Sequence, residues 1–217
     1  MRYALLGGFD GDASLIDRVG SIASDTSAEA ILLGGYFGND ASDDQVKAII
    51  EKLRDLHGQG VRMVAGRADK ALIEVMKTNR TLDEQLCDFI AALETTGLFY
   101  DPTENVHFTH SLSPLAAEAL PRKHVNKPYL ERALLEHTKL VKHTQGPVLF
   151  YVSPDEPWVH AIDRAGNFTS YPANEGSVIS LNTNAKAAIG IGKLSSGHAA
   201  LYDVNDRSLG FICPPSN

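Results

Sequence analysis

The stretch Arg2-Tyr-Ala-Leu-Leu-Gly-Gly-Phe-Asp-Gly-Asp12 decides the fold, because a short apolar run ends in two glycines and a helical pattern follows at once. The same arrangement recurs in Ile31-Leu-Leu-Gly-Gly35 and in Val61-Arg-Met-Val-Ala-Gly-Arg-Ala-Asp69. In an open α/β sheet, the carboxyl ends of the strands carry the ligand site. The three strand ends are therefore expected to face one crevice.

The remaining segments alternate at first and then change character. Strands are expected at 2–6, 29–33 and 61–65, and Asp12 is a suitable N-cap for a helix to about Ile22. Ser42 or Asp43 caps a helix that ends near His57, since Gly58 follows. Further helices are expected at 69–78, 82–96 and 129–143, and a strand at 106–109. From Pro147 onward, short strands are expected at 148–152, 158–162, 168–171, 177–181, 187–191 and 199–204.

Composition narrows the class of protein. The 217 residues are read as one domain, 1–217. The formal charge of −7 and the scattered 20 Lys and Arg argue against nucleic acid or an anionic membrane as a partner. Cys87 and Cys213 form no CxxC or Cys/His cluster, which disfavours a zinc finger or a disulfide scaffold. With no signal peptide pattern and no apolar stretch of about 20 residues, a cytoplasmic location is expected.

The order of elements and motifs resembles the calcineurin-like metallophosphoesterases, especially their small bacterial branch. That family has Asp-x-His-Gly-Asn after the first strand, Leu-Gly-Asp after the second, Gly-Asn-His-Asp after the third and a His after a later strand. The matching places here are Gly8-Phe-Asp10-Gly11-Asp12, Leu33-Gly34-Gly35, Gly66-Arg67-Ala68-Asp69 and Thr109-His110-Ser111. The family's Gly-Ser-Val turn is matched by Gly176-Ser177-Val178, and its Gly-His-x-His should fall near Tyr151-Val-Ser-Pro154, which has no histidine. The resemblance implies an α/β fold, an α/β/β/α sandwich with two mixed sheets.

The resemblance also shows which groups this chain lacks. The family's chemistry uses two bridged metals that clamp the phosphoryl group and activate a water. Here the metal-ligand positions hold Gly8, Gly35 and Arg67, and Ala68 replaces the proton-donating histidine. No metal, no cofactor and no catalytic residue is therefore expected.

The ligand-binding candidates in the former active-site crevice are Asp10, Asp12, Arg67, Asp69 and His110. Arg67 can grip phosphate or carboxylate in bidentate fashion, but an ion pair with Asp10 that fills the cavity is the favoured reading. His110 is either a ligand, proton donor or anion contact, or a hydrogen-bonded histidine without such a role. Asp69 and Asp12 are more simply explained as structural caps.

The favoured function is that of a pseudoenzyme, a degenerate phosphoesterase-fold protein that binds a small anion such as phosphate, a protein partner or a second copy of itself. The first alternative is a metal-dependent phosphoesterase with an altered or single-metal site, which Asp40, Asp43 and Asp44 could help to form. The second alternative is a nucleotide-binding protein that uses the turn of Gly7, Gly8 and Gly11.

Overall fold

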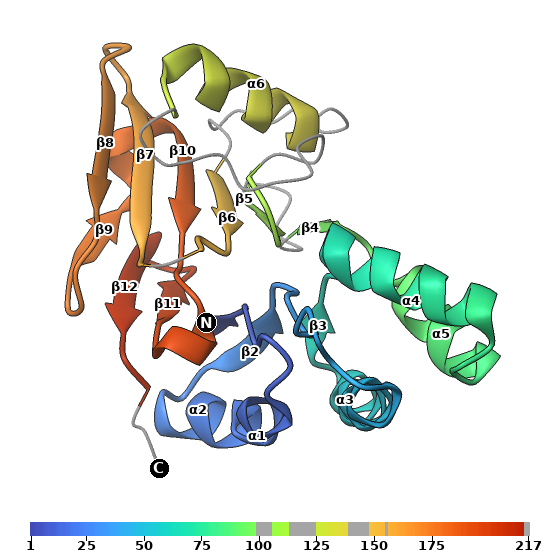
Figure 1. Ribbon diagram of the computed structural model, residues 1–217. Coiled ribbons are helices and arrows are strands. Elements are labelled where there is room, and N and C mark those ends of the chain that lie inside the picture. The colour runs from blue at the N-terminus through green and yellow to red at the C-terminus, as the bar shows by residue number, and fades with distance from the viewer. Residues whose placement is uncertain (99–105, 113–124, 139–147, 155, 215–217) are drawn as a thin grey trace.

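The computed structural model describes residues 1–98, 106–112, 125–138, 148–154 and 156–214, and within these ranges two six-stranded mixed sheets form the centre of the molecule (Figure 1). The first sheet has the order β3 (Arg62–Met63), β2 (Glu29–Leu32), β1 (Arg2–Leu6), β11 (Ala199–Asp203), β12 (Ser208–Ile212) and β9 (Val178–Ser180). The second has the order β4 (Thr96–Leu98), β5 (Val106–Thr109), β6 (Val148–Tyr151), β10 (Asn184–Gly190), β7 (Trp158–Asp163) and β8 (Phe168–Pro172).

Three apolar layers hold the sheets and helices together. Side chains alternate along β1, so that Leu5 packs between the two sheets while Leu6 faces the helices. The helices against the first sheet are α1 (Ala13–Asp17), α2 (Val19–Asp25), α3 (Asp43–Gly58), α4 (Arg67–Asn79) and α5 (Glu84–Ala92). On the second sheet, α6 (Lys127–Thr138) packs through Leu130 and Leu134. The predicted α/β/β/α sandwich is therefore confirmed.

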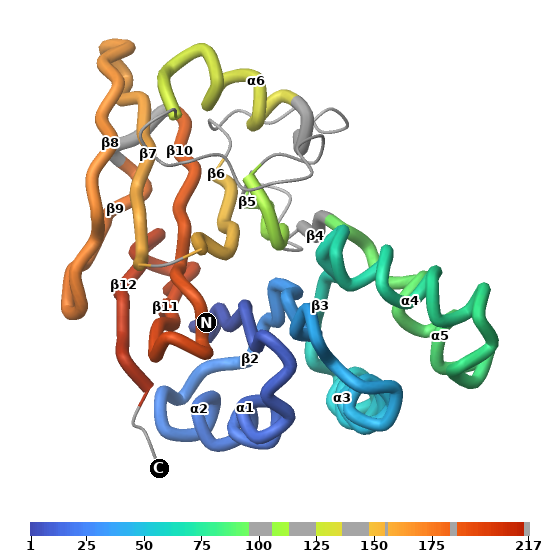
Figure 2. Tube along the Cα trace, in the orientation of Figure 1, coloured from blue at the N-terminus to red at the C-terminus, as the bar shows by residue number. Residues whose placement is uncertain are grey.

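The first and last parts of the chain meet inside the first sheet. Strand β1 lies parallel to β2 on one side and antiparallel to β11 on the other. Figure 2 shows the blue start of the chain beside the red segment of β11. Two short 3-10 turns, η2 (Leu181–Thr183) and η3 (Leu194–Ser196), precede β10 and β11. The turn at η3 thereby comes close to the end of β1.

Some boundaries differ from the sequence-based expectation. The helix expected from Asp12 to Ile22 divides at Arg18 into α1 and α2, and β4 was not expected at all. The helix expected at 129–143 begins two residues earlier, at Lys127, and its expected end at 139–143 lies outside the described residues. In the described part of the chain, the helices are all too short or too polar to cross a lipid bilayer.

Candidate functional site

Glycines at the ends of the first three strands bring several segments together at one place. The N–H of Gly8 donates to the Gly34 carbonyl at 2.9 Å, which joins the ends of β1 and β2. From the β10–β11 connection, the N–H of Leu194 donates to the Gly7 carbonyl at 2.8 Å. We call this place the strand-end site, and define it by Gly7, Gly8, Gly34, Gly35, Gly66, His110 and the segment 192–195.

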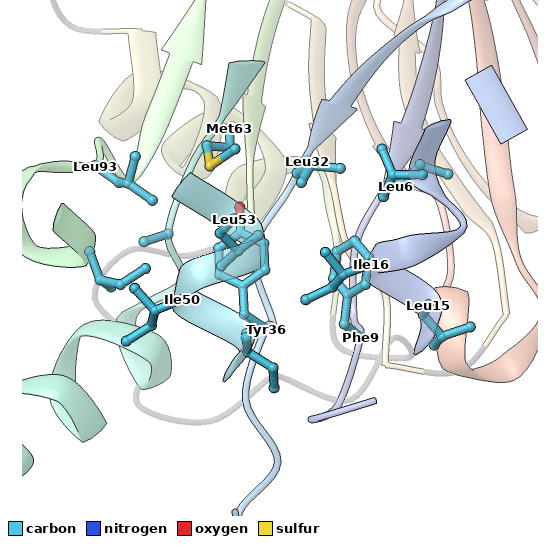
Figure 3. Packing of buried hydrophobic residues seen from close by; sticks show 14 of the residues in the cluster. Leu6, Phe9, Leu15, Ile16, Leu32, Tyr36, Ile50, Leu53, Met63 and Leu93 are labelled. Carbon is cyan, nitrogen blue, oxygen red and sulfur yellow. The ribbon is translucent and has the colours of Figure 1, made fainter. Parts of the chain in front are cut away.

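Two aromatic residues anchor the strand-end site in the core on the helix side. Phe9 follows Gly8 and Tyr36 follows Gly35, and both side chains are fully buried. Their ring centroids lie 5.7 Å apart, among Ile16, Leu53 and other apolar residues (Figure 3). The Tyr36 hydroxyl donates to the Val64 carbonyl at 2.7 Å. Burial, with the nearby Asp69 carboxylate, raises the pKa of Tyr36 well above its ordinary value, so this hydroxyl stays a donor.

His110 fills the space beside two of these glycines. A Cβ added at Gly35 would stand 2.8 Å from Cε1 of His110, and one added at Gly66 would stand 2.6 Å from Cδ2. The Nδ1 atom lies 3.1 Å from the Leu33 carbonyl, so Nδ1 carries the proton and donates it to that oxygen. The imidazole therefore occupies the place that an aspartate at position 35 would need.

Lys193 fills the space beside another of these glycines, Gly8. The sequence analysis did not single out this lysine. A Cβ added at Gly8 would stand 2.7 Å from Cγ of Lys193. The Nζ of Lys193 lies 2.9 Å from Oδ2 of Asp10, and the Ser195 hydroxyl donates to the same oxygen at 2.7 Å. Partial burial raises the pKa of Asp10, but the Ser195 hydrogen bond and the Lys193 ammonium outweigh this effect, so the pKa lies below its ordinary value.

The predicted ion pair between Arg67 and Asp10 is wrong. The Asp10 carboxylate is bonded to Lys193 and Ser195, and the Arg67 side chain is exposed at the first residue of α4. The physical reason is the position of the turn at η3. The hydrogen bond from Leu194 N to the Gly7 carbonyl holds this turn beside the end of β1, and the Lys193 ammonium therefore lies against Asp10.

Asp69 ties the end of β2 to the start of α4. Its side chain is only 2 % exposed, and its carboxylate accepts hydrogen bonds from the N–H groups of Gly66 at 2.8 Å, Gly35 at 2.9 Å and Tyr36 at 2.9 Å. A buried carboxylate with several N–H donors is a stable arrangement. The structural reading of Asp69 is therefore confirmed, and the carboxylate faces the protein's own backbone.

The other acidic candidates lie either at the N-terminal end of a helix or in a hollow on the surface. Asp12 caps α1 by accepting from Ser14 N at 2.9 Å, and the Ser14 hydroxyl hydrogen bond lowers the pKa of Asp12. Asp43 and Asp44 lie exposed in the first turn of α3. Asp40 instead lines a hollow of about 270 Å³ together with Asp10. Other residues lining this hollow are Gly11, Gly38, Asn39, Ala41 and Gln45.

The glycine turn after β1 does not present free N–H groups to a phosphate. The N–H groups of Phe9 and Asp10 both donate to the Gly35 carbonyl, at 2.7 and 3.0 Å, and Gly11 donates to the Tyr36 carbonyl at 3.1 Å. A nucleotide site of the helix N-terminus type needs such groups unoccupied. The structure gives no support to the nucleotide-binding alternative at this turn.

One sequence match to the later family motifs needs revision. Gly176 bonds through its N–H to the Phe211 carbonyl, on the side of β12 away from β1, so Gly176-Ser177-Val178 is not the turn that reaches the strand-end site. That turn is Gly192 to Ser195, and Gly192 N donates to Ser153 Oγ at 2.9 Å, just after β6. A signal for it exists, because the apolar run at 187–191 also ends among glycines.

The residues present do not fit the pair of metals that the family resemblance implies. Gly8 and Gly35 supply no side-chain donor atom, and the space for a side chain is taken by Lys193 at Gly8 and by His110 at Gly35. Among the described residues, no group of three or more His, Cys, Asp or Glu is arranged to hold a metal ion. The Lys193 ammonium is also paired with the Asp10 carboxylate, which a metal ion at this place would need as a ligand.

Comparison with known proteins identifies the fold. No family model matches the sequence, and no curated protein matches it. Among solved structures, the hypothetical protein PH1004 from Pyrococcus horikoshii OT3 superposes with a TM-score of 0.59 at 14% identity, over 100% of this chain and 88% of the other. A protein proposed to be a diadenosine tetraphosphatase gives a TM-score of 0.50 at 12% identity, over 100% and 95%. The phosphoesterase Yfce from E. coli gives 0.45 at 13%, over 98% and 99%. The chain therefore shares the fold of the first two of these structures, which in this chain is an α/β sandwich of two mixed sheets.

Proposed function

We propose that this chain is a non-catalytic phosphoesterase-fold protein that binds a small anion, or an acidic group of a partner, at the rim of its strand-end site. The observation that carries the proposal is the filling of the ligand positions. His110 lies against Gly35 and Gly66, and Lys193 lies against Gly8. Glycine at positions 8 and 35 supplies no carboxylate to hold a cation, and the Lys193 ammonium offsets the charge of Asp10. This arrangement therefore favours an anion more than one with carboxylates at those two positions would.

The groups that would perform hydrolysis have other roles here. His110 donates Nδ1–H to the Leu33 carbonyl, and the Asp69 carboxylate accepts from four backbone N–H groups. Position 68 corresponds in the resemblance to the family's histidine that protonates the leaving group, and it is an exposed alanine here. General acid–base catalysis requires a titratable group that can exchange a proton with the reacting atoms. Alanine at position 68 supplies none, and the Asp69 carboxylate is occupied by backbone N–H groups.

Arg67 is the residue that would make the anion contact. Its guanidinium is permanently charged, exposed, and at the first residue of α4, where the helix dipole adds positive potential. Gly66 lies against the His110 ring, which places the start of α4 directly beside the filled positions. An anion at this rim would meet the arginine without entering the occupied interior.

The test is calorimetric titration with inorganic phosphate and with nucleoside and sugar phosphates. Wild type is expected to bind, Arg67→Ala to lose binding, and Arg54→Ala, an equal charge change at an exposed position of α3, to keep it. If none of these phosphates binds wild type, or if Arg67→Ala binds as wild type does, the anion-binding proposal is wrong.

One observation favours the altered-metal alternative. Asp10 and Asp40 line the same hollow, so a single divalent ion has two carboxylates near one opening. Turnover of a generic phosphodiester with Mg²⁺ or Mn²⁺ that survives repurification and disappears in Asp40→Ala would establish this alternative. Unchanged, background-level turnover in both proteins is the expected result.

A further inference from the structure

We propose that Ser170 is a nucleophilic serine, activated by His160, which takes an acyl group from an activated ester. The two residues lie opposite each other on the neighbouring strands β8 and β7 (Figure 1). Their side chains share the face of the second sheet on which Ile162, Phe168 and α6 pack together. No residue of the strand-end site takes part, so this covalent step on one serine is independent of the proposed anion contact.

A chain of hydrogen bonds connects a buried imidazole to an exposed hydroxyl. His160 is fully buried, and its Nδ1 lies 2.9 Å from Ser170 Oγ. Its Nε2 lies 3.2 Å from the hydroxyl oxygen of Tyr151, at the end of β6. Tyr151 is 6 % exposed, whereas Ser170 is exposed. A buried partner at Nδ1 would satisfy the imidazole equally well, but here the partner at that nitrogen reaches solvent.

These three groups have the order that an activated nucleophile requires. A serine hydroxyl is a weak nucleophile unless a base within hydrogen-bond reach removes its proton and a third group orients the base. With its proton on Nε2, His160 donates to the Tyr151 oxygen and leaves the Nδ1 lone pair for the Ser170 hydroxyl. Ser170 is then the nucleophile, His160 the base and Tyr151 a positioning residue.

Two N–H groups lie beside the nucleophile. Nε1–H of Trp158 donates to Ser170 Oγ at 3.0 Å. At one end of the β7–β8 ladder, Ala173 N donates to the Pro157 carbonyl at 3.0 Å. Because hydrogen-bonded pairs alternate along an antiparallel ladder, the regular register directs the N–H of Ser170 away from β7. Donors placed in this way stabilise the negative charge that develops on the carbonyl oxygen during acyl transfer.

The covalent step is a simple acyl transfer. Ser170 Oγ bonds to the carbonyl carbon of the ester, and the bond between that carbon and the alcohol oxygen breaks. The Ser170 hydroxyl proton passes to Nδ1 of His160 and then to the departing oxygen, so the products are acyl-Ser170 and an alcohol. Trp158 and Pro172 lie opposite each other on the same face, and their apolar surface suits a small neutral acyl group such as acetyl.

The first experiment treats the full chain with p-nitrophenyl acetate and locates the acetyl groups by peptide mass spectrometry. Ser170 is expected to react about 100-fold faster than Ser21, an exposed serine of α2 in the same molecule, because general-base catalysis contributes at least that factor. His160→Gln should lower the rate at Ser170 to that at Ser21. Thr169→Ala, next to Ser170 but on the opposite face of β8, is the control and should leave the rate at Ser170 unchanged.

The second experiment reads the tautomer of His160 and needs no substitution of a buried residue. Two-bond ¹H–¹⁵N NMR spectra of wild type show which nitrogen of each imidazole carries the proton. For His160 the proton is expected on Nε2. Tyr151→Phe removes the acceptor at that nitrogen, so it should shift the proton toward Nδ1 and slow acetylation of Ser170, while acetylation of Ser21 stays unchanged.

Three results would overturn the proposal. They are equal rates of acetylation at Ser170 and Ser21 in wild type, a His160 proton on Nδ1 in wild type, and undiminished acetylation of Ser170 in folded His160→Gln. The first two are measured on wild type, so they decide the proposal even if His160→Gln fails to fold.

Discussion

Replacing Gly35 by alanine tests whether the strand-end site can accept a side chain where the resemblance places a metal-bridging aspartate. The residue has φ +71, a conformation that glycine adopts freely and alanine does not. The added Cβ would stand 2.8 Å from Cε1 of His110 and 2.9 Å from Cα of Gly8. The first contact is with a side chain that can turn, whereas the second is with backbone that is bonded to the end of β2.

The expected destabilisation has two parts. A left-handed conformation costs a non-glycine residue about 1–2 kcal/mol. Inserting a methyl group into filled space costs about 1–3 kcal/mol more. Gly35→Ala should therefore lower the free energy of unfolding by about 2–5 kcal/mol, and an aspartate at this position should cost at least as much.

Urea unfolding followed by circular dichroism measures this difference. Gly197→Ala is the matched control, because Gly197 has φ +79 but nothing within 4 Å of its added Cβ. It should show only the conformational cost, about 1–2 kcal/mol. The double variant Gly35→Ala/His110→Ala should recover only part of the loss, since the Gly8 contact remains. If Gly35→Ala and Gly197→Ala unfold at the same urea concentration, the account of a filled site is wrong.

Two further predictions concern the acidic residues. Asp69→Ala leaves four backbone N–H groups without their acceptor and should destabilise the fold by about 3 kcal/mol or more. Asp12→Ala removes only a helix cap and should cost about 1 kcal/mol in the same urea titration. Asp10→Asn should cost less than about 1 kcal/mol at neutral pH, because the Asp10 side chain is 45 % exposed and its partner Lys193 31 %. Because the pKa of Asp10 is lowered in the folded state, its stabilising effect is fully present above its ordinary value of 3.8 and is lost as the pH falls through the folded-state pKa. Unfolding curves of wild type and Asp10→Asn should therefore converge in acid, and a gap that widens instead would contradict the assignment.

The family resemblance predicted the layers, and local sequence patterns predicted several elements and two local roles in the site. Periodicity predicted β1, β2 and α3 closely, and N-cap chemistry predicted the role of Asp12. Asp69 could be read as a structural cap because its acceptor role is partly local, toward Gly66 three residues before it. Periodicity and capping depend on residues that are close in sequence, so both can be predicted without a structure.

The partner of Asp10 could not be obtained in the same way. Lys193 is 183 residues away from Asp10 along the chain, and nothing local distinguishes it from the other scattered cations. Arg67 was preferred as the partner of Asp10 because the family's order of motifs placed it nearby. The pairing of β1 with β11 instead brings Lys193, just before β11, to Asp10. The break at Arg18 was missed for a related reason, since the apolar positions continue through it on one face.

The position of β1 between an early strand and a late one has a consequence during synthesis. Until the chain has been made as far as Asp203, β11 does not exist, and the apolar strand Arg2–Leu6 is paired on one side only. An uncovered edge of this composition is a template for pairing with another chain. A ribosome-bound or prematurely ended product that stops before Ala199 would keep this edge open. Such products should depend on chaperones or proteases for their disposal, while the finished chain should not.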